Sequence, residues 1–121
     1  QVRIGELAGQ KFILREKTST TRQTLEKGLA AAGVDLGDTL EINSREAVME
    51  GIIRGLGIGA VSELEYVAHK RLRAIRITDA NIFISFYVVC LNSRRTRPLI
   101  QAFLKTAEGI AAINGTPPVQ K

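Results

Sequence analysis

Cysteine, histidine and aromatic residues are scarce in this chain of 121 residues, and tryptophan is absent. A single cysteine excludes an internal disulfide and any zinc site built from several cysteines. A single histidine, His69, excludes a His-rich metal centre, and any His-dependent catalytic triad would have to use it. Only 5% of the residues are aromatic, so few rings are available to stack on bases. The net charge of +5 permits a nucleic-acid partner but does not establish one. We expect no cofactor and no metal.

Long apolar runs are also missing. No stretch approaches the roughly 18 residues of a membrane-spanning helix, so we expect no membrane partner. The longest run, Ile82–Leu91, contains Ser85 and Tyr87 and predicts a strand instead. A hydrophobic share of 45% and a charged share of 24% are ordinary for a globular domain. Because the chain begins with Gln1 rather than Met, we interpret it as a fragment or a processed product.

Strand and helix patterns alternate along the first half of the chain. Phe12–Leu14 is a short apolar run typical of a strand buried on both faces, and a helix pattern follows it as far as Gly33. Thr39–Ile42 predicts a second strand, followed by a helix for which Asn43 and Glu46 have the spacing of a capping box. Ile58–Val61 predicts a third strand, whose glycine allows close backbone approach. This alternation predicts an α/β domain with a mainly parallel sheet.

The second half is predicted to extend this sheet and to close with a helix. Arg71–Ile77 alternates basic and apolar residues like a half-exposed strand, and Ile82–Leu91 would be the last strand. Asn92–Arg97 is a basic polar turn, and Pro98 suits the first turn of a helix. The residues from 115 to 121 contain two prolines and predict a disordered tail.

Hydroxyl groups gather where the three predicted parallel strands end. In open α/β sheets ligands bind outside the carboxyl ends of the strands, and the free N–H groups of helix N-termini there attract anions. The alternative is that each Ser, Thr or Asn only caps its helix. Three hydroxylated ends in one short domain favour a ligand site. The candidate residues are Thr18, Ser19, Thr20, Thr21, Arg22, Asn43, Ser44, Arg45, Ser62 and Glu63.

Glu63 decides which kind of anion would fit. A carboxylate beside an anion site repels the ligand unless the ligand also carries a cation, so a cleft-facing Glu63 indicates a zwitterion. The alternative is that Glu63 is a solvated helix residue. No set of nucleophile, base and orienting group emerges from the sequence, so we expect no enzyme.

The ordered set of segments resembles the effector-binding (substrate-binding) domain of LysR-type transcriptional regulators. Residues 12–22 are similar to that family's strand and ligand-contacting loop, in which Arg-Glu and a tight turn precede Thr-Arg. Residues 44–48 with 55–59 resemble its second helix and third strand, and residues 87–91 with 99–104 its closing strand and C-terminal helix. Thr18 and Thr20 replace the usual glycines, Lys17 a common Pro, and Ser62 a frequent Pro. Residues 43–67 also resemble the subgroup associated with catabolism of 2-aminoethylphosphonate, a zwitterion.

The resemblance implies a fold and a division of the chain. The fold is α/β and type 2 periplasmic-binding-protein-like, mainly the second subdomain plus the returning strand and C-terminal helix. Residues 1–10 would be a linker, 11–91 the effector-binding subdomain, 92–114 the helix returning to the first subdomain, and 115–121 the tail. No segment resembles the N-terminal winged helix-turn-helix, so DNA would be contacted only through a missing N-terminal domain.

The resemblance also implies a function. The chain would be the effector-sensing fragment of a bacterial, cytoplasmic regulator that binds a small anionic or zwitterionic metabolite and acts as a homo-oligomer. Ser19, Thr20, Thr21 and Ser44 would donate hydrogen bonds to the anionic group, Arg22 or Arg45 would add charge, and Ser62 or Glu63 would meet the other end. The alternatives are a solute-binding protein of a transporter, which shares the fold class, and a small metabolite enzyme.

Overall fold

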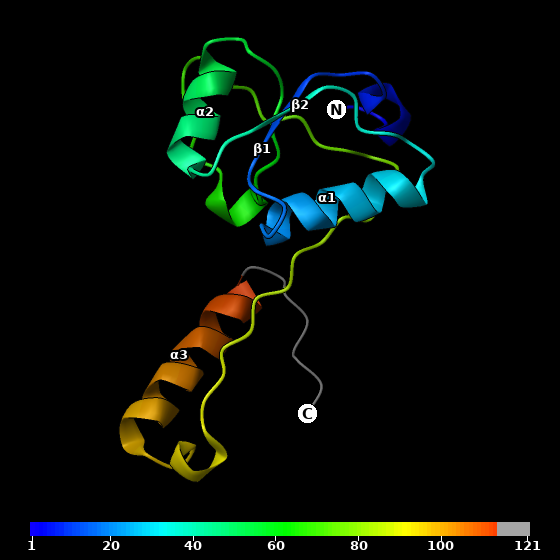
Figure 1. Cartoon of the computed structure of the whole chain (residues 1–121). Helices are drawn as coiled ribbons and strands as arrows, with labels where there is room; N and C mark the ends of the chain where they lie inside the picture. Colours follow the sequence, from blue (N-terminus) through cyan, green and yellow to red (C-terminus); the bar gives the residue numbers. More distant parts are fainter. Residues whose placement is uncertain (114–121) are drawn as a thin grey trace. The chain divides into compact units, whose positions relative to one another are not determined.

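Residues 1–113 are described by the computed structural model. The chain divides into two compact units, Gln1–Ile84 and Ser85–Lys121 (Figure 1). The predicted tail lies outside the described residues. Within residues 1–113, none of the helices combines the length and the apolar content needed to cross a membrane.

The first unit is built around one fully buried strand. Strand β1 (Phe12–Leu14) pairs in parallel with β2 (Thr39–Glu41), and Leu14 lies opposite Glu41. On its other side, Phe12 forms a parallel bridge with Ile58, where the N–H of Ile13 donates to the Ile58 carbonyl at 2.7 Å. The segment after Ile58 therefore runs in the same direction as both strands, with β1 in the middle.

Helices cover both faces of β1 (Figure 1). Phe12 and Leu14 pack with Leu25 and Leu29 of α1 (Thr20–Ala31), and Leu29 is only 1% exposed. The intervening Ile13 points to the opposite face, where its side chain lies against Gly51 of α2 (Arg45–Ile53). Because alternate residues of a strand face opposite sides, one apolar run of three residues serves both helices. This confirms the predicted double burial of Phe12–Leu14.

The first ten residues also contribute to this core. Helix η1 (Ile4–Leu7) buries Ile4 beside Phe12, and Asp79 accepts a hydrogen bond from the Ile4 N–H at 2.7 Å. Val2 bridges Ile77, so the segment predicted as a linker packs against the core of the first unit.

Three of the predicted strands do not form among residues 1–113. Ile58–Val61 makes a single bridge to β1, Arg71–Ile77 makes one bridge at Ile77, and Ile82–Leu91 forms no strand. Their β-branched and aromatic composition suits strands, but a strand persists only where neighbours satisfy its backbone groups. The predicted close approach at Gly59 is confirmed, because a Cβ there would lie 3.0 Å from the Ile13 carbonyl oxygen.

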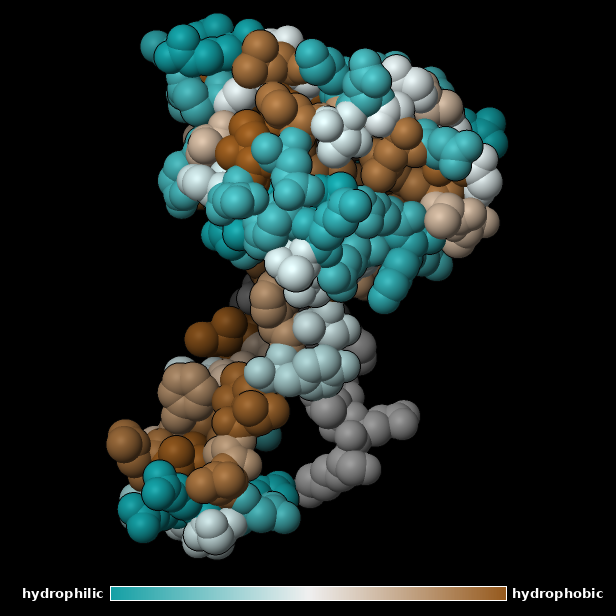
Figure 2. Space-filling model, viewed as in Figure 1, coloured by the Kyte–Doolittle hydropathy of each residue, from teal (hydrophilic) through white to brown (hydrophobic). Residues whose placement is uncertain are grey.

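The second unit contains η3 (Asn92–Arg94) and α3 (Pro98–Ile113). The prediction that Pro98 begins a helix is confirmed. Large apolar side chains remain exposed in this unit, and Figure 2 shows them gathered over α3 and the segment before it. They include Phe86, Tyr87, Val88, Val89, Leu91, Leu99, Phe103 and Ile110.

Candidate functional site

Three parallel segments of the first unit end at the same edge. β1 leads to Thr18–Arg22, β2 leads to Asn43–Arg45, and the segment that bridges β1 at Ile58 leads to Ser62–Glu63. We call these ten residues the strand-end edge. The chain passes from β1 to α1 on one face and from β2 to α2 on the other, so the connections diverge between the two strands. Such a divergence is where open α/β sheets form their binding crevices.

The N-terminus of α1 carries hydroxyls that the helix does not use. Ser19 is the N-cap residue, but its side chain makes no capping hydrogen bond. The Ser19 N–H donates to the Glu16 carbonyl at 2.9 Å, and the Ser19 carbonyl accepts from the Gln23 N–H at 3.0 Å. Within residues 1–113, no hydrogen bond is donated by the N–H groups of Thr20 or Thr21. This turn therefore offers both hydroxyl and amide donors.

The N-terminus of α2 is capped by Ser44. Its Oγ accepts from the Ala47 N–H at 3.2 Å and donates to a Glu46 carboxylate oxygen at 2.8 Å. The backbone N–H of Glu46 and then the Ser44 hydroxyl lower the pKa of the Glu46 carboxyl below its usual value. The predicted capping box at Asn43 is wrong by one residue, because the N-cap with its extended backbone is Ser44. Asn43 is exposed.

The third end is occupied by internal contacts. The Ser62 hydroxyl donates to Glu65 at 3.0 Å, and Glu65 pairs with Arg45 at 2.5 Å, which ties the start of α2 to η2 (Glu63–Glu65). Glu63 is 85% exposed and pairs with Arg76 at 2.9 Å. The structure thus joins the second and third ends through Arg45.

Arg22 is used inside the fold. Its side chain is only 7% exposed, and its guanidinium donates to Glu26, to Glu41 and to the Arg15 carbonyl. The hydrogen bond with Glu26 raises the pKa of Arg22 above its usual value, burial opposes this, and the bond with Glu41 reinforces it. The first and second ends are therefore joined through Arg22, and the sequence did not indicate this role.

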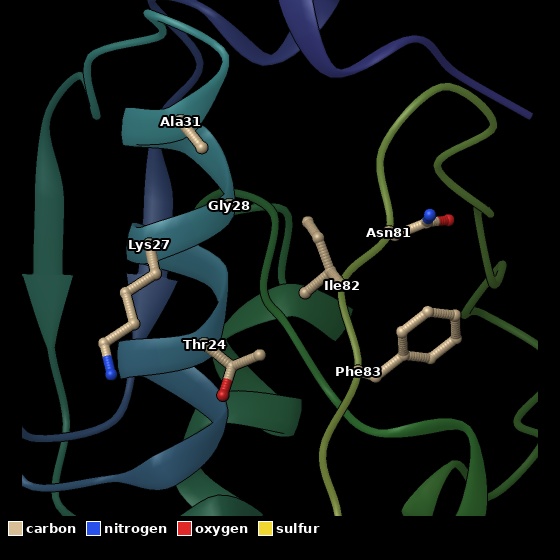
Figure 3. A pocket seen from close by; sticks show the side chains of 7 residues that line it. All are labelled: Thr24, Lys27, Gly28, Ala31, Asn81, Ile82 and Phe83. Carbon is tan, nitrogen blue, oxygen red and sulfur yellow. The ribbon is translucent and has the colours of Figure 1, made fainter.

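The described residues also form a hollow that sequence reasoning missed. It measures about 390 Å³ and lies between one face of α1 and the segment 81–83, and none of its lining residues belongs to the strand-end edge (Figure 3). Ile82 points toward Gly28, whereas Lys27 points away from that segment, so the hollow gathers no converging polar groups. The only sequence signal for it was a glycine inside a helix.

Metal ligands do not converge in the described part of the chain. No group of three or more His, Cys, Asp or Glu side chains among residues 1–113 could hold a metal ion. What the strand-end edge does offer is hydrogen-bond donors, and donors at helix N-termini suit an anion.

Comparisons with known proteins place these features in a family. Residues 1–110 match the family model of the LysR substrate binding domain. The chain is 28% identical over 106 residues to the RuBisCO operon transcriptional regulator of Allochromatium vinosum, which covers 84% of this chain and 35% of that protein. It is 30% identical over 109 residues to the HTH-type transcriptional regulator CbbR of Rhodospirillum rubrum, and this match covers 84% of this chain and 36% of that protein. A more distant relative is the HTH-type transcriptional regulator CysL of Bacillus subtilis, which is 25% identical over 85 residues. That match covers 68% of this chain and 28% of that protein.

Proposed function

Since this chain belongs to the LysR substrate-binding domain family, we propose that it senses a small anionic or zwitterionic metabolite for a LysR-type transcriptional regulator and binds it at the strand-end edge. The observation that carries the proposal is the N-terminus of α1, where the Ser19 hydroxyl makes no cap bond. A hydroxyl that does not stabilise its own helix is available to a ligand. The Asn43 amide and the Ser44 hydroxyl, which follow the neighbouring parallel strand β2, lie along the same edge.

The proposed contacts divide by charge. Ser19, Thr20 and Thr21 donate to the anionic group, and Ser44 does so by exchanging its hydrogen bond to Glu46 for one to the ligand. Arg45, which is half-exposed, adds positive charge. Glu63, although paired with Arg76, is exposed enough to meet a cationic group at the other end of a zwitterion. 2-Aminoethylphosphonate combines both charges and is our first choice of ligand.

The regulatory role belongs to a protein longer than this chain. The chain spans roughly a third of the length of the curated relatives it matches, so control of transcription and contact with DNA are proposals about the whole protein. The names of those relatives describe regulators and not enzymes, which supports a binding role without catalysis. The cytoplasm is the proposed location of this role.

The subdomain assignment is part of the same proposal. Residues 11–91 correspond to the second subdomain of a periplasmic-binding-protein-like fold, with residues 1–10 leading into it and 92–114 returning to the first. The exposed apolar side chains of α3, Leu99, Phe103 and Ile110, support the return of residues 92–114 to the first subdomain, because such residues are normally covered by another surface. They also support homo-oligomer formation.

Calorimetric titration tests the binding function. The protein is titrated with 2-aminoethylphosphonate, inorganic phosphate and acetate, and we expect saturable binding of the phosphonate or phosphate with competition between them. Heats of dilution alone for all three ligands would refute an anion site.

A further inference from the structure

Arg22 is the one charged residue buried among residues 1–113. A buried guanidinium is costly unless the charge is paired and its buried N–H groups find acceptors. Here Nε donates to Glu26 Oε1 at 2.7 Å, and Nη1 donates to Glu41 Oε2 at 2.6 Å and to the Arg15 carbonyl at 2.8 Å. The residue is therefore held in a single position.

The three partners of Arg22 lie on three different parts of the fold. Arg15 immediately follows β1, Glu41 is the last residue of β2, and Glu26 lies one turn further along α1. Arg22 itself comes directly after Thr20 and Thr21. One planar side chain thus links the hydroxyl turn of α1 to the end of the neighbouring strand.

We propose that Arg22 is a positioning residue that fixes the Ser19–Thr21 turn against the end of β2, so that the donors of α1 and Ser44 meet the same ligand. The proposal rests on the proposed function, and it assigns to Arg22 no contact with the ligand. Its contribution is geometric, because among residues 1–113 no other side-chain hydrogen bond joins this turn to the end of β2, and the backbone bonds of the β1–β2 pair are the remaining hydrogen-bonded link.

A substitution at Glu41 distinguishes a positioning role of Arg22 from a purely electrostatic effect on the ligand. Its side chain is 47% exposed, so Glu41→Gln keeps the size of the residue and leaves the core intact. If charge alone mattered, removal of a carboxylate near an anion site would tighten anion binding. Positioning predicts the opposite, because replacing the carboxylate by an amide removes the ion pair and weakens the bond by which Arg22 holds β2.

Two matched variants serve as controls. Glu26→Gln makes the same chemical change to a partner of Arg22 that lies on the same helix. Glu50→Gln makes it in the pair between Glu50 of α2 and the C-cap residue Arg54, which has the same four-residue spacing and the same Nε···Oε1 distance of 2.7 Å. Neither change breaks the link to β2.

The experiment measures phosphate and 2-aminoethylphosphonate affinity by calorimetry, and amide hydrogen exchange of the ligand-free chain by NMR. We expect Glu41→Gln to weaken binding at least fivefold and to speed exchange at both Ser19 and Ile42, whose N–H groups bond to Glu16 and Leu14. The two control variants should change affinity less than twofold and leave Ile42 unaffected.

An unchanged or tighter affinity in Glu41→Gln would overturn the positioning role. If the unaltered protein binds neither ligand, the proposed function fails, and the exchange data still decide the role of Arg22. Unchanged exchange at Ser19 and Ile42 would then show that the link does not couple the two ends.

Discussion

Ile82 packs its side chain directly onto Gly28 of α1 (Figure 3). A Cβ at position 28 would lie 2.7 Å from both Cγ1 and Cδ1 of Ile82, closer than such carbons approach one another. The glycine therefore lets the segment 81–83 lie against the helix. Ile82 stands two residues before the last residue of the first unit, Ile84, so this contact holds the end of that unit against α1.

A first prediction concerns this contact. Alanine inside a helix is favoured over glycine by about 1 kcal/mol. We nevertheless expect Gly28→Ala to destabilise the protein, because forcing Ile82 out of place costs about 1–3 kcal/mol. Urea unfolding measures the difference. In an Ile82→Ala background the same substitution should become stabilising.

Gly109 of α3 provides the matched control, since no atom of the described residues 1–113 lies within 4 Å of its would-be Cβ. Gly109→Ala should therefore stabilise the helix by about 0.5–1 kcal/mol. A stabilising effect of Gly28→Ala alone would contradict the packing of Ile82 on α1.

The two serine N-caps should respond differently to substitution. Ser44→Ala removes a capping hydrogen bond and should lower the free energy of unfolding by about 1 kcal/mol. Ser19→Ala removes no cap bond and should change it by less than about 0.5 kcal/mol. Urea unfolding of the two variants checks this. Equal losses at both positions would mean that Ser19 is an ordinary cap.

The contact between the N-terminal segment and Asp79 should make the free energy of unfolding depend on pH in the acid range. The Ile4 N–H, and to a lesser degree Arg3, lower the pKa of Asp79 below its usual 3.8. This stabilisation is fully present above pH 3.8 and is lost as the pH falls through the lowered pKa. Asp79→Asn should therefore flatten the pH dependence of the unfolding midpoint below that pH.

Asp35→Asn is the control for this experiment. Asp35 is exposed, and its side chain makes no hydrogen bond within residues 1–113. Its variant should keep the acid dependence of the unaltered protein. An Asp79→Asn variant with the same steep loss would contradict the contact with Ile4.

The exposed apolar residues of the second unit should cause self-association. Val89 is 86% exposed within a β-rich segment that forms no strand, and a lysine there opposes edge pairing. We expect Val89→Lys to lower the mass measured by light scattering at high concentration. Ala30→Lys adds the same charge on an exposed position of α1 and should leave the mass unchanged. A monomeric unaltered protein would contradict the prediction.

The sequence predicted the elements whose signals are local. β1, α1, β2, α2 and α3 all occur where apolar spacing, hydroxyl-rich turns, glycine stops and Pro98 indicated them. The strand predicted at Ile82–Leu91 does not form, because a composition that favours strands does not by itself provide a neighbouring strand to pair with. A strand requires partners whose positions the segment itself does not encode.

The candidate site was predicted in outline. The sequence placed the hydroxyl turns at the ends of parallel strands, and the pairing of Leu14 with Glu41 agrees with that. The inward direction of Arg22 was missed, because it depends on Glu41, 19 residues away. The Glu26 carboxylate at the i+4 position was the one local signal, and it is equally common on solvent-exposed helices.

The central claim is that hydroxyls of the strand-end edge bind an anion. The most direct test is calorimetry with 2-aminoethylphosphonate and inorganic phosphate on a Ser19→Ala, Ser44→Ala double variant, with Thr106→Ala of α3 as the control. Because each lost hydrogen bond is worth about 1 kcal/mol, we predict an affinity at least tenfold weaker in the double variant and unchanged in the control. An unchanged affinity in the double variant would contradict the assignment of the site.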